Sequence, residues 1–202
     1  MLAKPGVNGQ LAAMTQTSSS LAARRYSLGA ILLHWTIALL IIGNVIGAFV
    51  AEDLPKADAQ AVMNLHKATG LLVLALSVAR IVWRLTHRPP PYPPEMKPWE
   101  VKLAKGVHAL LYVLMIAIPL TGWIFVSVAT GGKPIDFYGL FGWPGLPLAQ
   151  SRDTAGLVSE MHEILAFALI GLWLVHVAGA LKHMFAHKFF RMWPGRSAAL
   201  PG

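Results

Sequence analysis

The sequence predicts an all-α integral membrane protein built as a four-helix bundle, and two observations lead to this prediction. The 202-residue chain is 55% hydrophobic and only 13% charged, whereas a soluble domain carries about a quarter charged residues. It also contains four apolar segments, each near the roughly 20 residues that cross a bilayer as a helix. The length suits a single domain. The lipid bilayer is therefore the first expected partner of the chain.

The four predicted helices form one transmembrane domain, residues 28–187, between two short extensions. Residues 1–27 are rich in Ser, Ala and Gly and lack a sustained apolar run, so we expect a flexible cytoplasmic leader. Residues 188–202 are expected to be a short cytoplasmic tail. The apolar segments that define the helices span about 28–51, 61–85, 106–128 and 158–186.

Two of the three connections have a distinctive composition. The second contains Arg88-Pro89-Pro90-Pro91-Tyr92-Pro93-Pro94, which predicts an extended spacer because consecutive prolines cannot form a helix. The third, residues 129–157, is long and rich in Gly, Pro and aromatic residues. Aromatic side chains favour the membrane–water interface, so this connection is predicted to form an interfacial cap. Its aromatic residues are Phe137, Tyr138, Phe141 and Trp143.

The basic residues predict the orientation of the bundle. The net charge of +8 would suggest nucleic acid in a soluble protein. Here most basic residues flank apolar segments, which indicates a topology signal and no nucleic-acid partner. Thirteen of the 17 lie in the leader, the second connection with its flanks, and the tail. Both termini are therefore expected to face the cytoplasm.

Histidine carries the chemistry of this sequence. The chain has no cysteine, which excludes disulfides, iron–sulfur clusters, thiolate ligation of haem and covalent haem attachment through Cys. It has eight histidines. A lone histidine inside a membrane can simply bond a neighbouring helix, but ionisable residues there are also candidates for function. Several histidines at matching depths favour function.

Four histidines fall at two depths once the topology is applied. His162 and His176 are 14 residues apart in the fourth segment, which is about 21 Å on nearly one helix face. His66 lies near the outer end of the second segment, and His34 near the inner end of the first. Spacing therefore predicts an outer pair, His66 and His162, and an inner pair, His34 and His176.

Two bis-histidine sites stacked across a bilayer suit two haems. Paired imidazoles fill both axial positions of a haem iron, which favours electron transfer over oxygen chemistry. Structural zinc needs four ligands, and only two are expected at each depth. A di-iron carboxylate site needs intramembrane Glu residues, whereas Glu160 and Glu163 lie at a helix end.

Three further residues are candidates near these sites. Gly70 lies one turn beyond His66, where a missing side chain would admit a flat macrocycle, although glycine also serves helix packing. Arg80 lies 14 residues after His66, on the same face at the depth of the inner pair, where it can pair with a haem propionate. His108 lies at the inner end of the third segment and remains an alternative inner ligand, proton relay or quinone contact.

Short motifs in all four segments resemble the prokaryotic cytochrome b561 family. The resemblance covers about residues 25–194. The motifs are Arg25-Tyr26-Ser27 with Ile31-Leu32-Leu33-His34-Trp35; Asn64-Leu65-His66-Lys67-Ala68-Thr69-Gly70; Ala79-Arg80 with Trp83-Arg84-Leu85; Ala117-Ile118-Pro119-Leu120-Thr121-Gly122; and Met161-His162-Glu163, His176, His183 and Arg191-Met192-Trp193-Pro194.

The resemblance implies a dihaem b-type cytochrome of the bacterial inner membrane that exchanges electrons with the quinone pool. The family's haem-ligand positions match His34, His66, His162 and His176, and ubiquinone is the implied substrate or bound ligand. Some members oxidise superoxide, which would make the chain a quinone-linked oxidoreductase. The alternative is a cytochrome b anchor subunit that takes electrons from a docked dehydrogenase or hydrogenase. A redox partner protein and a homodimer are further expected partners, and a haem-free transporter or structural bundle ranks last.

Overall fold

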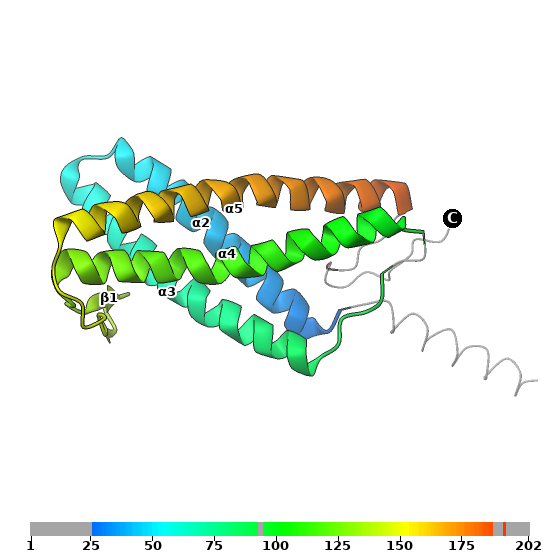
Figure 1. The fold of residues 1–202 in the computed structure, drawn as a ribbon, viewed down its shortest axis with the longest axis horizontal. Coiled ribbons are helices and arrows are strands. Elements are labelled where there is room, and N and C mark those ends of the chain that lie inside the picture. The colour runs from blue at the N-terminus through cyan, green and yellow to red at the C-terminus, as the bar shows by residue number, and fades with distance from the viewer. Residues whose placement is uncertain (1–25, 93–94, 188–191, 193–202) are drawn as a thin grey trace, which may run out of the picture.

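The structure is a computed structural model that describes residues 26–92, 95–187 and 192. Residues 1–25 of the expected leader lie outside the described residues, as does the expected tail apart from Met192. The described residues form a bundle of four long helices that lie along its long axis (Figure 1). They are α2 (Leu28–Glu52), α3 (Lys56–Thr86), α4 (Pro98–Thr130) and α5 (Arg152–His187).

Each of the four helices is long and apolar enough to cross a membrane. The outer surface of the bundle is correspondingly apolar: Leu85 is 78% exposed and Phe185 77% exposed. In water such a surface would be unfavourable, whereas in lipid it needs no cover. The predicted all-α four-helix membrane fold is therefore confirmed.

The helices begin at recognisable signals, and α4 and α5 begin earlier than their apolar segments. Ser27 caps α2 by accepting a hydrogen bond from the backbone N–H of Ala30 at 3.4 Å. α4 starts at Pro98, and Glu100 accepts a hydrogen bond from the backbone N–H of Lys97 at 2.9 Å. The first turns of α4 are polar and precede the expected start near residue 106. Hydropathy detects only the part of a helix that lies in lipid, so it missed these turns.

The helices pack as two antiparallel hairpins. α2 packs along α3, α4 packs along α5, and the two hairpins meet where α3 packs on α4. No other pair of described helices packs extensively. α2 and α5 approach each other through side chains, as where the ring centroids of Phe49 and Phe167 lie 6.3 Å apart.

A small β-hairpin joins α4 to α5 at one end of the bundle (Figure 1). β1 (Ile135–Phe137) pairs antiparallel with β2 (Phe141–Trp143). The composition of this connection predicts an aromatic cap but no strands. Gly139 (φ 70°) lies in the tight turn between them, with the backbone N–H donating to Asp136 at 3.0 Å.

The connection between α4 and α5 is also hydrogen-bonded to the C-terminal end of α4. The fully buried Ser127 hydroxyl donates to the Trp123 carbonyl at 2.7 Å and accepts from the Leu146 backbone N–H at 3.0 Å. Trp123 Nε1 donates to the Pro144 carbonyl at 3.0 Å. These bonds hold the segment between β2 and α5 against the bundle.

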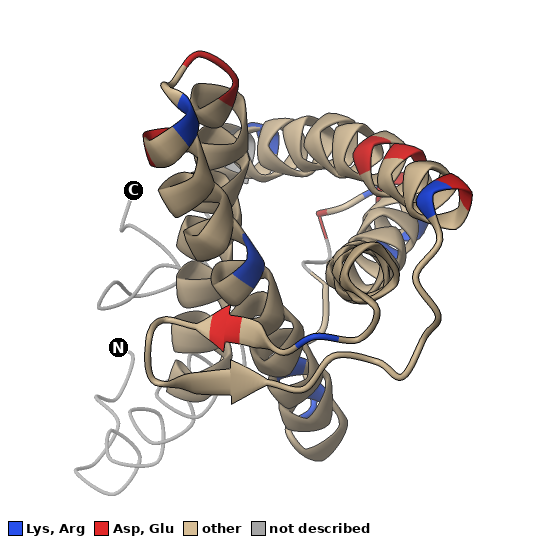
Figure 2. Ribbon diagram, turned by 90° about the vertical axis from the view of Figure 1, so that its left-hand side faces the viewer, with Lys and Arg blue, Asp and Glu red and all other residues tan. Residues whose placement is uncertain are grey.

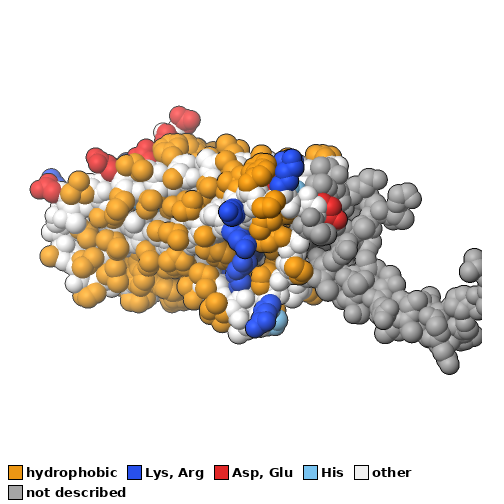
Figure 3. All heavy atoms as spheres, turned by 45° about the vertical axis from the view of Figure 1, so that its right-hand side comes forward, with side chains coloured by type: hydrophobic (Ala, Val, Ile, Leu, Met, Phe, Trp, Pro, Cys, Tyr) orange, Lys and Arg blue, Asp and Glu red, His pale blue; other side chains and the backbone are white. Residues whose placement is uncertain are grey.

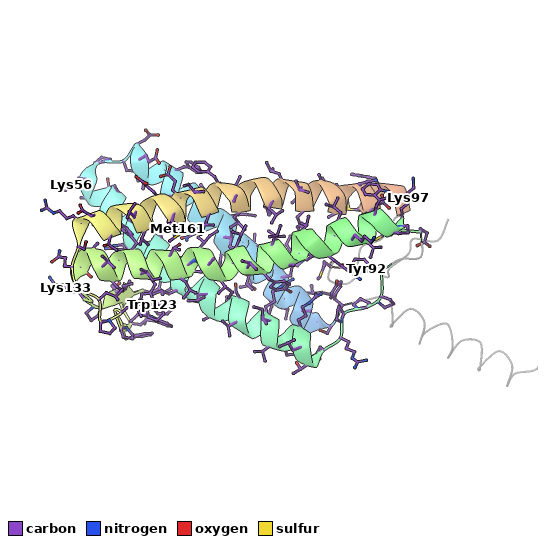
Figure 4. All side chains as sticks on the ribbon, in the orientation of Figure 1. Lys56, Tyr92, Lys97, Trp123, Lys133 and Met161 are labelled. Atoms are coloured by element: carbon purple, nitrogen blue, oxygen red, sulfur yellow. The ribbon has the colours of Figure 1, made fainter. Side chains whose placement is uncertain are left out.

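Charge is distributed unevenly along the bundle. Figure 3 shows apolar side chains over most of its length, with Lys and Arg gathered in a band towards one end. Acidic residues lie mainly at the other end, in the α2–α3 connection and at the start of α5 (Figure 2). Figure 4 places Lys56 and Lys133 at this second end, and Lys97 and Tyr92 at the basic end.

Candidate functional site

The structure brings four histidines together as two pairs inside the bundle. The imidazole centroids of His66 and His162 are 6.2 Å apart with their planes at 73°. The centroids of His34 and His176 are also 6.2 Å apart, again at 73°. The pair containing His162 lies towards the end marked by Lys56 and Lys133, because Met161, the neighbour of His162, lies on that side in Figure 4.

Helix geometry explains how α5 contributes one histidine to each pair. α5 carries His162 and His176, 14 residues apart, and so presents both to the interior at levels about 21 Å apart. α3 supplies the partner at the outer level, and α2 supplies the partner at the inner level. Each pair therefore joins one hairpin to the other.

Backbone carbonyls orient both rings of the outer pair. His66 Nδ1 lies 3.2 Å from the Asn44 carbonyl oxygen, and His162 Nδ1 lies 3.0 Å from that of Ile118. A carbonyl oxygen only accepts, so each Nδ1 carries the proton and donates it. The lone pair of each Nε2 is then free to bind a metal, and such a fixed tautomer is usual for metal-bound histidine.

Two residues of α4 refine the position of His162. The Thr121 hydroxyl donates to the Ile118 carbonyl at 2.7 Å and lies 3.1 Å from His162 Nδ1. A Cβ atom at Gly122 would lie 3.2 Å from His162 Cε1, so glycine leaves room for the ring. The roles of Asn44, Ile118 and Thr121 become visible only in the structure. Thr121 and Gly122 belong to a recognisable motif, but a backbone acceptor leaves no signal in a sequence.

The inner pair is held differently. Neither His34 nor His176 makes a ring hydrogen bond within the described parts of the chain. His34 instead contacts Trp35, with ring centroids 5.4 Å apart. His108 also lies at this level, with its ring centroid 5.2 Å from that of His176 and the planes at 73°.

The pair spacing can be compared with that of two imidazoles on one metal. A metal–nitrogen bond of about 2.0 Å, with the ring centre about 1.1 Å behind the nitrogen, puts two opposed rings about 6 Å apart. Both pairs meet this requirement at 6.2 Å. His108 and His176, at 5.2 Å, are 1.0 Å closer, which suits an edge contact rather than opposed ligands of one iron.

Other metal centres fit less well. The described residues contain no group of three or more His, Cys, Asp or Glu side chains that could hold a metal ion. A tetrahedral zinc site and a carboxylate-bridged di-iron site both need more protein ligands than two. Two opposed imidazoles suit a group that brings its own equatorial ligands, as haem does.

The face of α3 between the two levels has room for such a group. A Cβ atom at Gly70 would have no atom within 4 Å. Ser77 is fully buried, and its hydroxyl has no hydrogen-bond partner among the described residues. Both residues lie at helical spacing on the face that also carries His66 and Arg80. The residues present therefore fit a flat, partly polar group.

Arg80 is half-buried and reaches across to two other helices. Its Nε donates to the Tyr112 hydroxyl at 3.2 Å, and its Nη1 to the Ala30 carbonyl at 3.5 Å. A guanidinium has five N–H groups, so these two bonds leave donors for an anionic group such as a propionate. Its charge acts on His34, His176 and His108. Arg84, one turn further along α3, is exposed and lies 5.7 Å from the centre of the Tyr112 ring.

Comparison with known proteins gives a consistent result. Residues 25–195 match the family model described as "Prokaryotic cytochrome b561". The chain is 31% identical over 166 residues to "Cytochrome b561 homolog 2" of Escherichia coli (strain K12), covering 81% of this chain and 87% of that protein. It is 30% identical over 179 residues to "Probable superoxide oxidase CybB" of Yersinia pestis, covering 85% of this chain and 97% of that protein.

Proposed function

Because the chain belongs to the prokaryotic cytochrome b561 family of membrane b-type cytochromes, we propose that it holds two haem b groups and carries electrons between a donor and the quinone pool. The observation that carries this proposal is the pair of histidine sites with the same 6.2 Å spacing and the same 73° ring angle. His66 and His162 are the proposed outer ligands, and His34 and His176 the proposed inner ligands.

The haem iron supplies one-electron chemistry, and the residues of this chain decide how it is used. With one imidazole from each helical hairpin holding a haem, each site would be suited to transferring electrons rather than to binding oxygen. The Asn44 and Ile118 carbonyls hold the outer imidazoles in place. The space at Gly70 would accommodate the macrocycle, and Arg80 would be placed to pair with a propionate at the inner level.

We propose superoxide as the donor at the outer end. Two superoxide ions would each lose one electron to become O2, and one quinone would take up both electrons and two protons to become quinol. The proposal is supported by the similarity to a protein named a probable superoxide oxidase. Lys67, Lys133 and Arg152 are outer cations that can attract an anion, although Glu52, Asp53 and Asp58 weaken that attraction.

The second candidate is a cytochrome b anchor that passes electrons from a docked dehydrogenase or hydrogenase to quinone. The observation in its favour is the apolar tip of the β-hairpin, where Leu140 is 76% exposed and Phe141 50% exposed. Such a tip can contact a partner protein. A complex that copurifies with a soluble redox subunit would favour this function over superoxide oxidation.

We also propose a location and an orientation. The basic end of the bundle faces the cytoplasm, which places both termini there and the β-hairpin outside. For a bacterial protein this corresponds to the inner membrane with the outer pair near the periplasm. Cysteine substitutions at Lys102 and Lys133, labelled with a membrane-impermeant thiol reagent in intact cells, distinguish the two faces. Labelling at position 133 alone is the expected result.

Purification in detergent provides the main test of the proposed function. We expect two haem b per chain and a dithionite-reduced spectrum of low-spin haem b. One haem per chain, or none, would contradict the dihaem proposal. Rapid mixing of the loaded protein with superoxide and a water-soluble ubiquinone analogue then tests the donor, because only a superoxide oxidase reduces the quinone at the expense of superoxide.

A further inference from the structure

We infer that the two histidine pairs give their haems unequal reduction potentials, with the inner pair, His34 and His176, forming the higher-potential site. The inference rests on the proposed function, because it concerns the two haems assigned there. It also gives the direction of electron flow, because electrons that enter at the outer haem move to the inner haem, where the potential is higher. Two independent differences between the sites carry it.

The first difference is the bonding of the ligand rings. In the outer pair both Nδ1–H groups donate to backbone carbonyls, of Asn44 at 3.2 Å and of Ile118 at 3.0 Å. Such a bond makes the imidazole more basic and a stronger electron donor to the metal. Stronger donation favours ferric over ferrous iron and so lowers the reduction potential. The inner rings have no corresponding acceptor within the described residues.

The second difference is the charge beside each pair. Arg80 is half-buried at the inner level, where Tyr112 and the Ala30 carbonyl fix its guanidinium. An added electron near a buried cation is stabilised, because the interior screens the attraction weakly. Arg80 therefore raises the reduction potential of the inner site. The lack of carbonyl acceptors at the inner rings also raises the reduction potential of the inner site, so the two effects add.

The outer level also has a cation, but in a different setting. Lys67 follows His66 in the chain, and its Nζ bonds Asn64 Oδ1 at 3.0 Å in an exposed hydrogen bond. Lys67 and Arg80 are both half-buried, but the hydrogen bond of Lys67 is exposed whereas those of Arg80 are partly buried. Water and salt therefore screen the Lys67 charge more strongly, so Lys67 has less influence than Arg80. Arg84, the other cation near the inner level, is exposed.

This difference orders the proposed electron path. A one-electron donor gives up one electron at the outer pair, and that electron moves to the site of higher potential at the inner pair. Two such electrons, with two protons from water, reduce one quinone to quinol. Reverse flow would need energy equal to the difference in potential.

Potentiometric titration of the loaded protein under anaerobic conditions tests the inference. The absorbance of reduced haem b, followed against applied potential, should require two one-electron components whose equilibrium constants differ at least tenfold, which is about 59 mV. Arg80→Gln should lower the higher component by a similar factor and leave the lower one in place. Arg80→Lys, which keeps the charge, should restore most of the difference.

Two further variants make the assignment specific. Arg84→Gln removes an exposed cation from the same helix end and should shift the higher component less than Arg80→Gln. Thr121→Val removes the hydroxyl that also donates to the Ile118 carbonyl, which leaves that carbonyl to His162 Nδ1–H alone, and should lower the lower component alone. Haem content is measured for each variant, and a shift in reduction potential is interpreted only where both haems are present.

The inference is overturned if the wild-type protein titrates as two equal sites. It is also overturned if Arg80→Gln moves the lower component, or if Thr121→Val moves the higher one. These outcomes leave two haems per chain and so leave the proposed function intact. A wild-type protein with fewer than two haems would instead overturn the proposed function, and this inference with it.

Discussion

Gly122 of α4 lies directly against the imidazole ring of His162 in α5, so that a Cβ atom added at position 122 would lie 3.2 Å from His162 Cε1. A contact of this length forces the ring to move, although only slightly. The ring is also fixed by its bond to the Ile118 carbonyl. Gly122 therefore couples the packing of two helices to the geometry of a proposed haem ligand.

Gly122→Val should reduce haem content from two towards one per chain, and Gly122→Ala should have a smaller effect. The reason is displacement of His162, since alanine is a better helix former than glycine by about 1 kcal/mol and does not harm the helix itself. A pyridine haemochrome assay per mole of chain measures the change. Gly156→Val is the matched control, because a Cβ at Gly156 would have no atom within 4 Å. Equal loss in both variants would contradict the prediction.

The 73° angle between the imidazole planes of each proposed ligand pair predicts an unusual magnetic signal from both sites. Nearly perpendicular imidazole planes leave two iron d orbitals close in energy, so the ferric ion keeps much orbital angular momentum. The oxidised protein should show strongly anisotropic low-spin signals by electron paramagnetic resonance at low temperature. A moderately anisotropic rhombic signal, as given by parallel ligand planes, would count against the geometry of the pairs.

Substitution of His34 and His108, two of the three histidines at the inner level, separates their roles. His34→Ala should leave one haem per chain, whereas His108→Ala should keep two, because only the His34–His176 pair has the spacing of opposed ligands. Haem content and the reduced spectrum provide the measurement. The reverse pattern, with haem lost in His108→Ala and kept in His34→Ala, would make His108 the inner ligand.

Ser127→Ala should loosen the connection between α4 and α5. The Ser127 hydroxyl is fully buried and accepts from the Leu146 backbone N–H, so its loss leaves that donor unsatisfied at a cost of about 1–3 kcal/mol. Faster limited proteolysis between residues 131 and 151 is the expected result. Thr130→Val is the control, since its hydroxyl bonds only the Val126 carbonyl of its own helix among the described contacts. No difference between the two variants would show that the bond does not anchor the segment.

Much of the architecture could be predicted because membranes simplify the relation between sequence and fold. A bilayer requires long apolar helices, so hydropathy alone indicates four spans. Helical rise converts the 14 residues between His162 and His176 into two levels. With alternating topology, this leads to the two pairs whose rings the structure places 6.2 Å apart.

The remaining details depend on tertiary contacts that have no pattern in the sequence. The bonds from His66 to Asn44 and from His162 to Ile118 use main-chain oxygens, and every residue has one. The β-hairpin consists of two strands of three residues each, too short for a period of two to be detected. The Ser77 hydroxyl, which has no hydrogen-bond partner in the described part of the chain, could be identified only once the packing of the helices was known.

The way in which the two helical hairpins meet has a consequence for how the protein matures in the cell. The two helical hairpins touch mainly through α3 and α4, while each histidine pair crosses from one hairpin to the other. If the proposed haems bind at these pairs, each of them would link one hairpin to the other and would add to the stability of the folded chain. A chain made without haem would lack these links and would be more accessible to membrane proteases, so the supply of cofactor would set how much of the protein accumulates.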